Sequence, residues 1–231
     1  MTQTPYLPAG DSFEFQENTF FNNPEPRVPC LLLLDVSGSM SGNPIRDLNE
    51  GVKLFKDELM ADPLTVKRAE PAIITFGNTV EMVSEFATVE SFVPPTLIAS
   101  GLTPMGEAVN LALDKLASRK EAYKQNGVSY YRPWIFLITD GGPTDNWQLA
   151  ARRAIEEQNK KACSLFAVGV EGANLEILKE FSVKEPLKLK ELRFRDLFKW
   201  LSSSLKSVSR STPGEEVGLE NPVAPSGWAT V

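Results

Sequence analysis

The sequence contains no histidine. This absence excludes nucleophilic catalysis of the Ser-His-Asp and Cys-His types, and it excludes histidine as a metal ligand. Cysteine is scarce as well: Cys30 and Cys163 each lie in an apolar, strand-like run, and no Cys-x-x-Cys spacing occurs. We therefore expect both thiols to be buried and free rather than bound to a metal.

Long apolar runs and basic stretches are also missing. No window approaches the roughly 18 to 20 continuous apolar residues of a membrane span. Residues 1–26 contain no Lys or Arg, so they lack the basic start of a secretory signal, and we expect a cytoplasmic protein. The net charge of -6 offers no general attraction for nucleic acid or anionic lipid, so we expect neither as a partner.

What is present is a regular alternation of strand-like and helix-like segments. Apolar runs of strand length occur at Cys30–Leu34, Ala72–Phe76, Trp134–Thr139 and Ser164–Val170. Helical periodicity occurs at Pro44–Met60, from Pro104 to about Lys120, at Asp145–Lys161 and at Phe194–Ser207. The stretch TVEMVSEFATVESF alternates enough to form an edge strand.

Strands that are apolar throughout are covered on both faces. The sequence therefore predicts an α/β fold: a doubly wound, mostly parallel central sheet with helices on both faces and one antiparallel edge strand. We expect an N-terminal arm at 1–26, one folded domain at 27–208 and a flexible C-terminal tail at 209–231. The arm is expected to pack on the domain through its phenylalanines: Phe13, Phe15, Phe20 and Phe21.

Two of the predicted strands run into an aspartate, Asp35 after the first and Asp140 after the fourth. In doubly wound sheets, ligands bind beyond the carboxyl ends of the strands, and the common strand order places these two strands side by side. Two partly desolvated carboxylates repel each other, which raises one pKa unless a cation lies between them. No Lys or Arg adjoins either aspartate, so a divalent metal ion is the simplest counter-charge.

Hydroxyl groups accompany the two carboxylates. Ser37 and Ser39 alternate with Asp35 in LLLLDVSGSM, and Thr103 stands just before a helix in SGLTPMGEA. An oxygen-only set favours a hard cation, Mg²⁺ or alternatively Mn²⁺ or Ca²⁺, over zinc. Taken singly, Asp35 is compatible with a turn cap and Thr103 with an ordinary helix N-cap before Pro104, but together the five side chains predict a metal site.

The stretches DVSGSM, GLTPMGEAV and LITDGGPTD resemble the three parts of the metal-ion-dependent adhesion site (MIDAS) of von Willebrand factor A (VWA) domains. The resemblance covers about Arg27 to Ser209. It matches residue by residue at Asp35, Ser37, Ser39, Thr103 and Asp140. It implies a six-coordinate metal with about three direct protein oxygens, water at most other positions, and one position open to an acidic residue of a partner protein.

A narrower resemblance rests on RFRDLFKWLSSSLKSVSRS near the end of the chain together with DVSGSMSGNPI. These stretches resemble the bacterial tellurium-resistance-associated VWA proteins of the TerY-like group. The resemblance implies a small cytosolic protein that works with a protein kinase and a protein phosphatase in a stress or defence system.

An enzyme is the alternative. A haloacid-dehalogenase-type phosphotransferase needs an aspartate where this chain has Ser37, and the phosphate loop Gly-x-x-x-x-Gly-Lys-Ser/Thr does not occur. Metal-assisted hydrolysis with Asp35 or Asp140 as the base survives, although no second acid-base group accompanies it. We therefore expect a metal-dependent interaction module without catalytic residues.

The tryptophans differ in their surroundings. Trp147 and Trp200 have apolar neighbours at helical spacing and are expected in the core, although Trp147 follows Asp140 closely enough to line the site. Trp228 lies in the tail with nothing nearby to bury it. We therefore expect the tail to be a docking peptide with Trp228 as its anchor. The alternatives are a tail glutamate that reaches the metal of a second copy and a disordered end of no consequence.

Overall fold

The computed structural model describes residues 20, 23–215, 217–224 and 227–230. Within this part of the chain, seven strands form one sheet in the order β3-β2-β1-β4-β5-β6-β7. The strands are β1 (Val28–Asp35), β2 (Ala69–Phe76), β3 (Val80–Ser84), β4 (Trp134–Thr139), β5 (Ser164–Gly169), β6 (Leu187–Leu189) and β7 (Ala229–Thr230). The inner pairs are parallel, whereas β3 and β7 pair antiparallel at the two edges.

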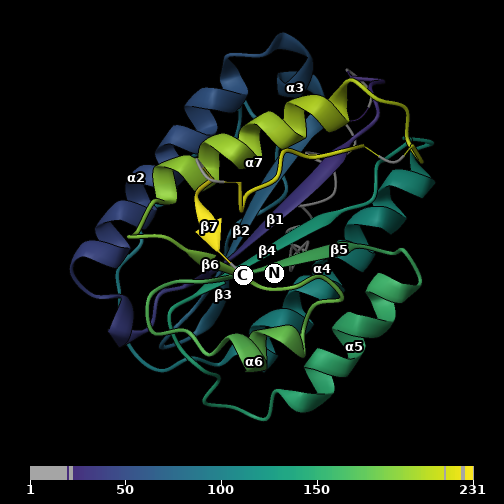
Figure 1. The fold of residues 1–231 in the computed structure, drawn as a ribbon. Helices are drawn as coiled ribbons and strands as arrows, with labels where there is room; N and C mark the ends of the chain where they lie inside the picture. The colour runs from purple at the N-terminus through teal and green to yellow at the C-terminus, as the bar shows by residue number, and fades with distance from the viewer. Residues whose placement is uncertain (1–19, 21–22, 216, 225–226, 231) are drawn as a thin grey trace, which may run out of the picture.

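Helices cover both faces of the sheet (Figure 1). On one side lie α2 (Asn43–Met60), α3 (Pro63–Arg68) and α7 (Phe194–Ser209); on the other lie α4 (Met105–Gln125), α5 (Gln148–Asn159) and α6 (Leu175–Lys179). None of these described helices has the length and apolar character needed to cross a membrane. The predicted fold class is confirmed, and β7 adds a second antiparallel edge strand that we did not expect.

The leucine run of β1 faces both layers of helices. Leu32 and Leu34 belong to the core that includes α2 and α7, whereas Leu31 and Leu33 belong to the core that includes α4 and α5. All four are fully buried. Because successive side chains of a strand point to opposite faces, a strand covered on both sides buries all of them, which favours an unbroken apolar run such as this one. Burial of each leucine contributes roughly 1.5–3 kcal/mol.

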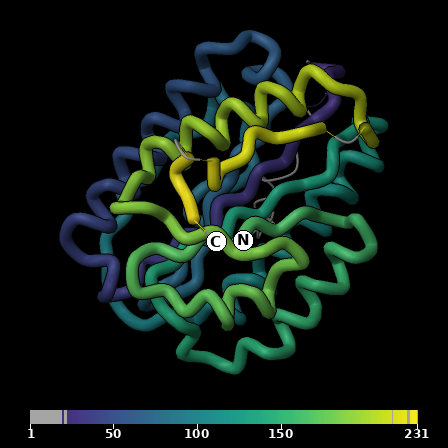
Figure 2. The backbone as a smooth tube through the Cα atoms, viewed as in Figure 1, coloured from purple at the N-terminus to yellow at the C-terminus, as the bar shows by residue number. Residues whose placement is uncertain are grey.

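The sheet reverses its winding direction beside β1. The chain builds β2 and β3 on one side of β1, returns to the other side, and continues outward through β4, β5 and β6 (Figure 2). β1 and β4 are parallel neighbours, and Leu34 pairs with Ile138. The carboxyl ends of these two strands therefore form the switch point at which doubly wound sheets bind ligands.

Several single-residue expectations are confirmed. Cys30 and Cys163 are buried free thiols, and burial raises the pKa of Cys163 to about 11. Trp200 is buried in the core. Trp147 packs against Phe181, with ring centroids 5.6 Å apart, so its indole supports the core.

The described part of the C-terminal tail packs against its own domain. Trp228 is 3% exposed, and its ring centroid lies 5.5 Å from that of Trp200. The indole N–H of Trp200 in turn donates to the carbonyl of Glu220 at 2.8 Å. The expectation that nothing nearby would bury Trp228 is therefore wrong, because α7 provides the apolar surface. Trp228 is not a free anchor for a partner, while the boundaries of arm, domain and tail stay a prediction.

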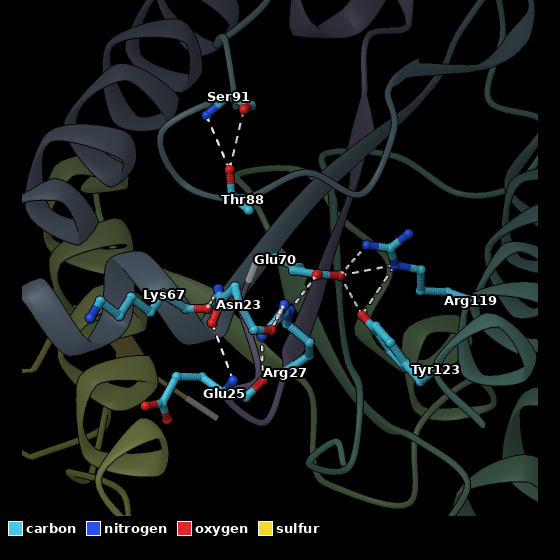
Figure 3. Close-up of polar contacts among 9 residues, drawn as sticks. All are labelled: Asn23, Glu25, Arg27, Lys67, Glu70, Thr88, Ser91, Arg119 and Tyr123. Carbon is cyan, nitrogen blue, oxygen red and sulfur yellow. Dashed lines mark hydrogen bonds and ion pairs between the residues drawn. The ribbon is translucent and has the colours of Figure 1, made fainter. Parts of the chain in front are cut away.

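A buried charge network lies where the parallel strands β1 and β2 begin, at the end of the sheet opposite the switch point (Figure 3). Glu70, in β2, is fully buried and accepts hydrogen bonds from Arg27 Nε at 3.0 Å and from Arg119 Nη2 at 2.6 Å. The Tyr123 hydroxyl donates to the same carboxylate. Burial, and then the charge of Glu70, raise the pKa of Tyr123 well above its usual value, so the phenol stays a neutral donor. The carboxylate of Glu70 in β2 is thus bonded both to the residue just before β1 and to the C-terminal half of α4.

Phe20 of the N-terminal arm covers this network. Its side chain is buried, and its ring centroid lies 4.8 Å from the guanidinium carbon of Arg119 and 5.6 Å from the ring centroid of Tyr123. The expectation that the arm packs on the domain is confirmed at Phe20. The other phenylalanines of the arm lie outside the described residues: Phe13, Phe15 and Phe21.

We expect Glu70→Gln to lower the free energy of unfolding by about 3–5 kcal/mol, because it leaves two buried guanidinium groups without their counter-charge. Urea denaturation measures this loss. The control is Glu50→Gln, which breaks an exposed ion pair with Lys53 and should leave the unfolding midpoint unchanged. Equal stability of Glu70→Gln and the wild type would contradict this role of the network.

Candidate metal centre

Asp35 and Asp140 lie at adjacent strand ends. Asp35 is the last residue of β1, and Asp140 directly follows Thr139, the last residue of β4. Because β1 and β4 are parallel neighbours, both carboxylates lie at the switch point of the sheet. Asp35 is fully buried and Asp140 is 9% exposed. The structure therefore brings these two predicted ligands together.

Two donors hold the carboxylate of Asp35. Its Oδ1 accepts from the backbone N–H of Ser37 at 2.7 Å, and its Oδ2 accepts from the hydroxyl of Thr139 at 2.5 Å. Burial raises the pKa of Asp35 above its ordinary value; the two hydrogen bonds oppose that rise, and the nearby charge of Asp140 adds to it. An ionised Asp35 is therefore costly unless a cation lies close to it.

The serine hydroxyls connect the two carboxylates. Ser37 Oγ lies 2.9 Å from Ser39 Oγ, and the Ser39 hydroxyl donates to Asp140 Oδ1 at 2.7 Å. The turn that produces this arrangement is η1 (Gly38–Met40), a short 3-10 helix directly after Ser37. Asp35, Ser37, Ser39 and Asp140 thus form one continuous hydrogen-bonded set.

Thr103 reaches the site on the loop before α4. Its Oγ1 lies 3.7 Å from the position that a β-carbon on Gly141 would occupy, and Gly141 directly follows Asp140. The backbone N–H of Thr103 donates to Thr144 Oγ1 at 3.0 Å, and its carbonyl accepts from the Thr144 N–H at 2.9 Å. The N-cap residue of α4 is Pro104. The alternative that Thr103 merely caps this helix is therefore wrong.

Backbone contacts hold the Thr103 loop against the loop that follows β1. The N–H of Gly38 donates to the carbonyl of Gly101 at 3.0 Å, and the N–H of Ser100 donates to the carbonyl of Val36 at 2.7 Å. Gly101 has a φ of +81°, and a β-carbon there would lie 2.4 Å from the backbone of Asn78. Only glycine fits this position without moving the turn between β2 and β3, where Asn78 lies.

Three residues that support the site were not predicted as functional: Thr139, Thr144 and Asp145. The Asp145 carboxylate accepts from the backbone N–H of Gly106 at 3.1 Å and of Glu107 at 2.8 Å, in the first turn of α4. α5 begins at Gln148 and not at the expected Asp145. The sequence shows a cluster of polar residues around Asp140, which could have drawn attention to these three. Their hydrogen-bond partners, however, lie far away along the chain.

The donor set fits a hard divalent cation. No ion pair among the described residues involves Asp35 or Asp140. The described part of the chain also holds no group of three or more His, Cys, Asp or Glu side chains that could bind a metal. The site therefore offers two carboxylates with neutral hydroxyls, a ligand set typical of Mg²⁺, Mn²⁺ or Ca²⁺ rather than of a zinc site.

A known protein family matches most of this chain. A family model described as the von Willebrand factor type A domain matches residues 31–195. The chain belongs to the von Willebrand factor type A family. The matched span begins in β1, includes all five predicted ligands and ends in α7.

Several solved structures share this fold. The vWF domain of the type V pili tip protein Mfa5 from Porphyromonas gingivalis is 10% identical, with a TM-score of 0.62, 84% of this chain covered and 99% of that chain. BatB from Bacteroides thetaiotaomicron is 20% identical, with a TM-score of 0.50. The match covers 78% of this chain and 100% of that chain. Proximal thread matrix protein 1 from the mussel byssus, in a structure with a zinc-occupied MIDAS motif, is 12% identical, with a TM-score of 0.54. The match covers 80% of this chain and 49% of the mussel protein.

The VWA domain of this chain thus spans about half the length of the mussel protein. At these identities the likeness shows the fold alone. No curated protein sequence matches the chain.

We expect Asp35→Asn to stabilise the metal-free VWA domain at neutral pH. A pKa that is raised in the folded state means that the folded protein binds the proton more tightly, so this contribution to stability is present at low pH. It is lost as the pH rises from the unfolded pKa through the raised folded pKa. Asparagine cannot ionise, so the variant does not lose this stability as the pH rises.

Added Mg²⁺ should reverse the order of stability. At a metal concentration about 100 times its Kd, the wild type should gain about 2.7 kcal/mol in the free energy of unfolding, whereas Asp35→Asn should gain little. Urea denaturation with Mg²⁺ and with EDTA measures both effects, and Asp114→Asn, on the exposed surface of α4, is the matched control. An equal gain in wild type and Asp35→Asn would contradict the assigned site.

Proposed function

We propose that this VWA domain is a metal-dependent interaction module that binds an acidic side chain of a partner protein. The observation that carries the proposal is the hydrogen-bonded set in which Ser37 and Ser39 join Asp35 to Asp140. These four residues and Thr103 would hold Mg²⁺, or alternatively Mn²⁺ or Ca²⁺. The bound ion would supply a positive charge with a position open to a carboxylate, because the hydroxyl ligands are neutral.

The burial of the ligands indicates the side from which a partner approaches. Asp35 is fully buried beneath the loop, whereas Ser39 is exposed. Thr139 and the Ser37 amide hold Asp35 in one orientation, so its carboxylate is positioned before any ion arrives. A partner carboxylate would therefore approach from the side of Ser39.

The comparisons support this proposal at the level of the family. The zinc-occupied MIDAS motif of the mussel protein is a precedent for a metal in this fold. The narrower interpretation stays a prediction: a cytoplasmic protein of a bacterial tellurium-resistance, stress or defence system, with a protein kinase and a protein phosphatase as partners. It depends on the sequence of α7 and of the metal loop.

Binding of a carboxylate to the metal can be tested with Mn²⁺, which enhances the relaxation of the water protons bound to it. We expect N-acetyl-aspartate amide to lower this enhancement in the wild type by displacing water from the open position. N-acetyl-asparagine amide is the matched control probe and should have little effect. Ser39→Ala should weaken Mn²⁺ binding. The proposal fails if the two probes act alike.

A metal-dependent hydrolase that uses Asp35 or Asp140 as its base is the alternative function. Hydrolysis at a metal needs a group that transfers protons to the leaving atom. The sequence has no histidine, and both oxygens of Asp35 already accept hydrogen bonds. We therefore favour the interaction module.

We expect no turnover of phosphate esters, nucleotides or peptides in the presence of Mg²⁺ or Mn²⁺, because the sequence has no histidine to transfer protons beside the metal ligands. Release of phosphate and cleavage of a fluorogenic peptide are the measurements. A metal-dependent rate that Asp140→Ala abolishes would establish the hydrolase instead.

A further inference from the structure

A cavity of about 850 Å³ lies at the end of the sheet opposite the metal centre. Its lining includes Trp134 and Ser164, the first residues of the parallel strands β4 and β5, whereas the metal centre lies where the strands end. The cavity shares no residue with that centre, and we call it the amino-end cavity. Its volume is typical of a small-molecule site, for which roughly 300 to 1,000 Å³ is usual.

The charge of the amino-end cavity is opposite to that of the whole chain. The chain has 24 basic and 30 acidic residues. Among the described residues that line the cavity, Glu215 is the one acidic side chain, and four are basic: Lys120, Arg132, Lys161 and Lys184. A concave surface lined mainly by one sign of charge concentrates ions of the opposite sign. The cavity therefore attracts anions.

The four basic side chains have no counter-charge in the described part of the chain, since none of them forms an ion pair there. The acidic residues nearest to three of them in the sequence are paired with other lysines: Glu121 with Lys124, Glu157 with Lys160 and Glu185 with Lys179. The carboxylate of Glu215 accepts from the backbone N–H of Thr212 at 2.8 Å. The acids of the fold thus leave these cations available to a ligand.

Three of the cations lie near the start of β5. The ammonium group of Lys120 donates to the carbonyl of Ala162 at 3.3 Å, and Ala162 directly follows Lys161. Burial raises the pKa of the Cys163 thiol to about 11, and the charges of Lys120 and Arg132 oppose that rise. Both charges are therefore close to Cys163, the residue just before β5.

Lys161 occupies a backbone position that usually takes glycine. It directly follows Lys160, the C-cap of α5, and has a φ of +57°. This left-handed conformation is common for a glycine after a helix and unfavourable for a residue with a β-carbon. Lysine therefore has a conformational cost here that glycine would not have.

Aromatic side chains form flat walls beside the cations. Tyr131, Trp134 and Phe166 line the cavity. The ammonium group of Lys184 lies 5.2 Å from the centroid of the Phe166 ring, so attraction between cation and ring holds this lysine against the wall. Positive charge and flat apolar surface thus occur together.

The C-terminal tail forms a further wall. The Tyr131 hydroxyl donates to the carbonyl of Ser211 at 2.5 Å, and the Trp200 indole donates to the carbonyl of Glu220 at 2.8 Å. Between these two contacts, four described tail residues line the cavity: Gly214, Glu215, Val217 and Leu219. The tail is therefore fixed at both ends of the stretch that closes the cavity.

We propose that the amino-end cavity binds a small organic anion in which a flat ring carries two or more negative charges. The cations without counter-charge would bind the anionic groups, and the aromatic walls would contact the ring. A nucleic acid is an unsuitable occupant, because the basic residues lie in one concavity rather than along a stripe and the chain has a net charge of -6. The site would act without the metal ion.

Nucleotides and aromatic dicarboxylates share this chemistry, so the test uses one probe of each kind: ADP and benzene-1,3-dicarboxylate. Binding to the full chain is measured by calorimetry in EDTA, which prevents ADP from binding through a metal ion. Pyrophosphate and glutarate carry the charges without the ring, while adenosine and benzene-1,3-dicarboxamide carry the ring without the charges. We expect at least one ring probe to bind about tenfold more tightly than both of its controls, and that probe identifies the source.

Lys161→Gly separates binding from stability. Glycine suits a φ of +57°, so we expect the melting temperature to stay the same or to rise. The affinity for the bound ring probe should fall about fivefold, because a cation is lost from the cavity. An unchanged affinity would show that Lys161 is only a turn residue and would contradict the proposal.

Arg132→Gln and Arg152→Gln are a matched pair with the same change of charge. Both arginines are exposed, but Arg132 lines the cavity, whereas Arg152 lies in α5 and does not. We expect Arg132→Gln to weaken binding of the ring probe about fivefold and Arg152→Gln to leave it unchanged. Equal effects of the two variants would show that the probe binds elsewhere.

Three further outcomes would overturn the proposal. The first is that neither ring probe binds with a Kd below about 1 mM. The second is that each ring probe binds no more tightly than pyrophosphate or glutarate, which would show a charged patch that does not recognise a ring. The third is that a triglutamate peptide binds more tightly than both ring probes, which would identify an acidic protein segment as the occupant.

Discussion

The repulsion between Asp35 and Asp140 is the constraint on which this end of the domain depends. Two carboxylates at the ends of adjacent buried strands are unfavourable unless donors or a cation compensate them. The Ser37 amide, the Thr139 hydroxyl and the Ser39 hydroxyl compensate part of the charge. All three donors are neutral, so they leave the two carboxylates without a counter-charge among the described residues.

Buried charge is compensated differently at the two ends of the parallel strands. Where the parallel strands begin, Glu70 is paired with Arg27 and Arg119 inside the fold, and the network is complete without any ligand. Where they end, no basic side chain of the described residues pairs with Asp35 or Asp140. The first arrangement pairs its charges within the fold and holds one end of β1, while the second leaves the other end without a paired counter-charge among the described residues.

The parts of the fold that depend on regular patterns were predictable from the sequence. Continuous apolar strands predicted a covered parallel sheet, and the spacing of Asp35, Ser37 and Ser39 predicted one convergent loop. Contacts between distant segments were not predictable. β6 and β7 are too short to show periodicity, and the burial of Trp228 depends on Trp200 in α7. The role of Asp145 likewise depends on amides in α4, far from it along the chain.

We propose that one divalent ion binds between the ends of β1 and β4. Anomalous diffraction from crystals of the protein grown with Mn²⁺ would locate such an ion. We expect a single strong anomalous peak among the side-chain oxygens of Ser37, Ser39 and Asp140. The absence of a peak there from protein saturated with Mn²⁺, or a peak only at another place on the domain, would contradict it.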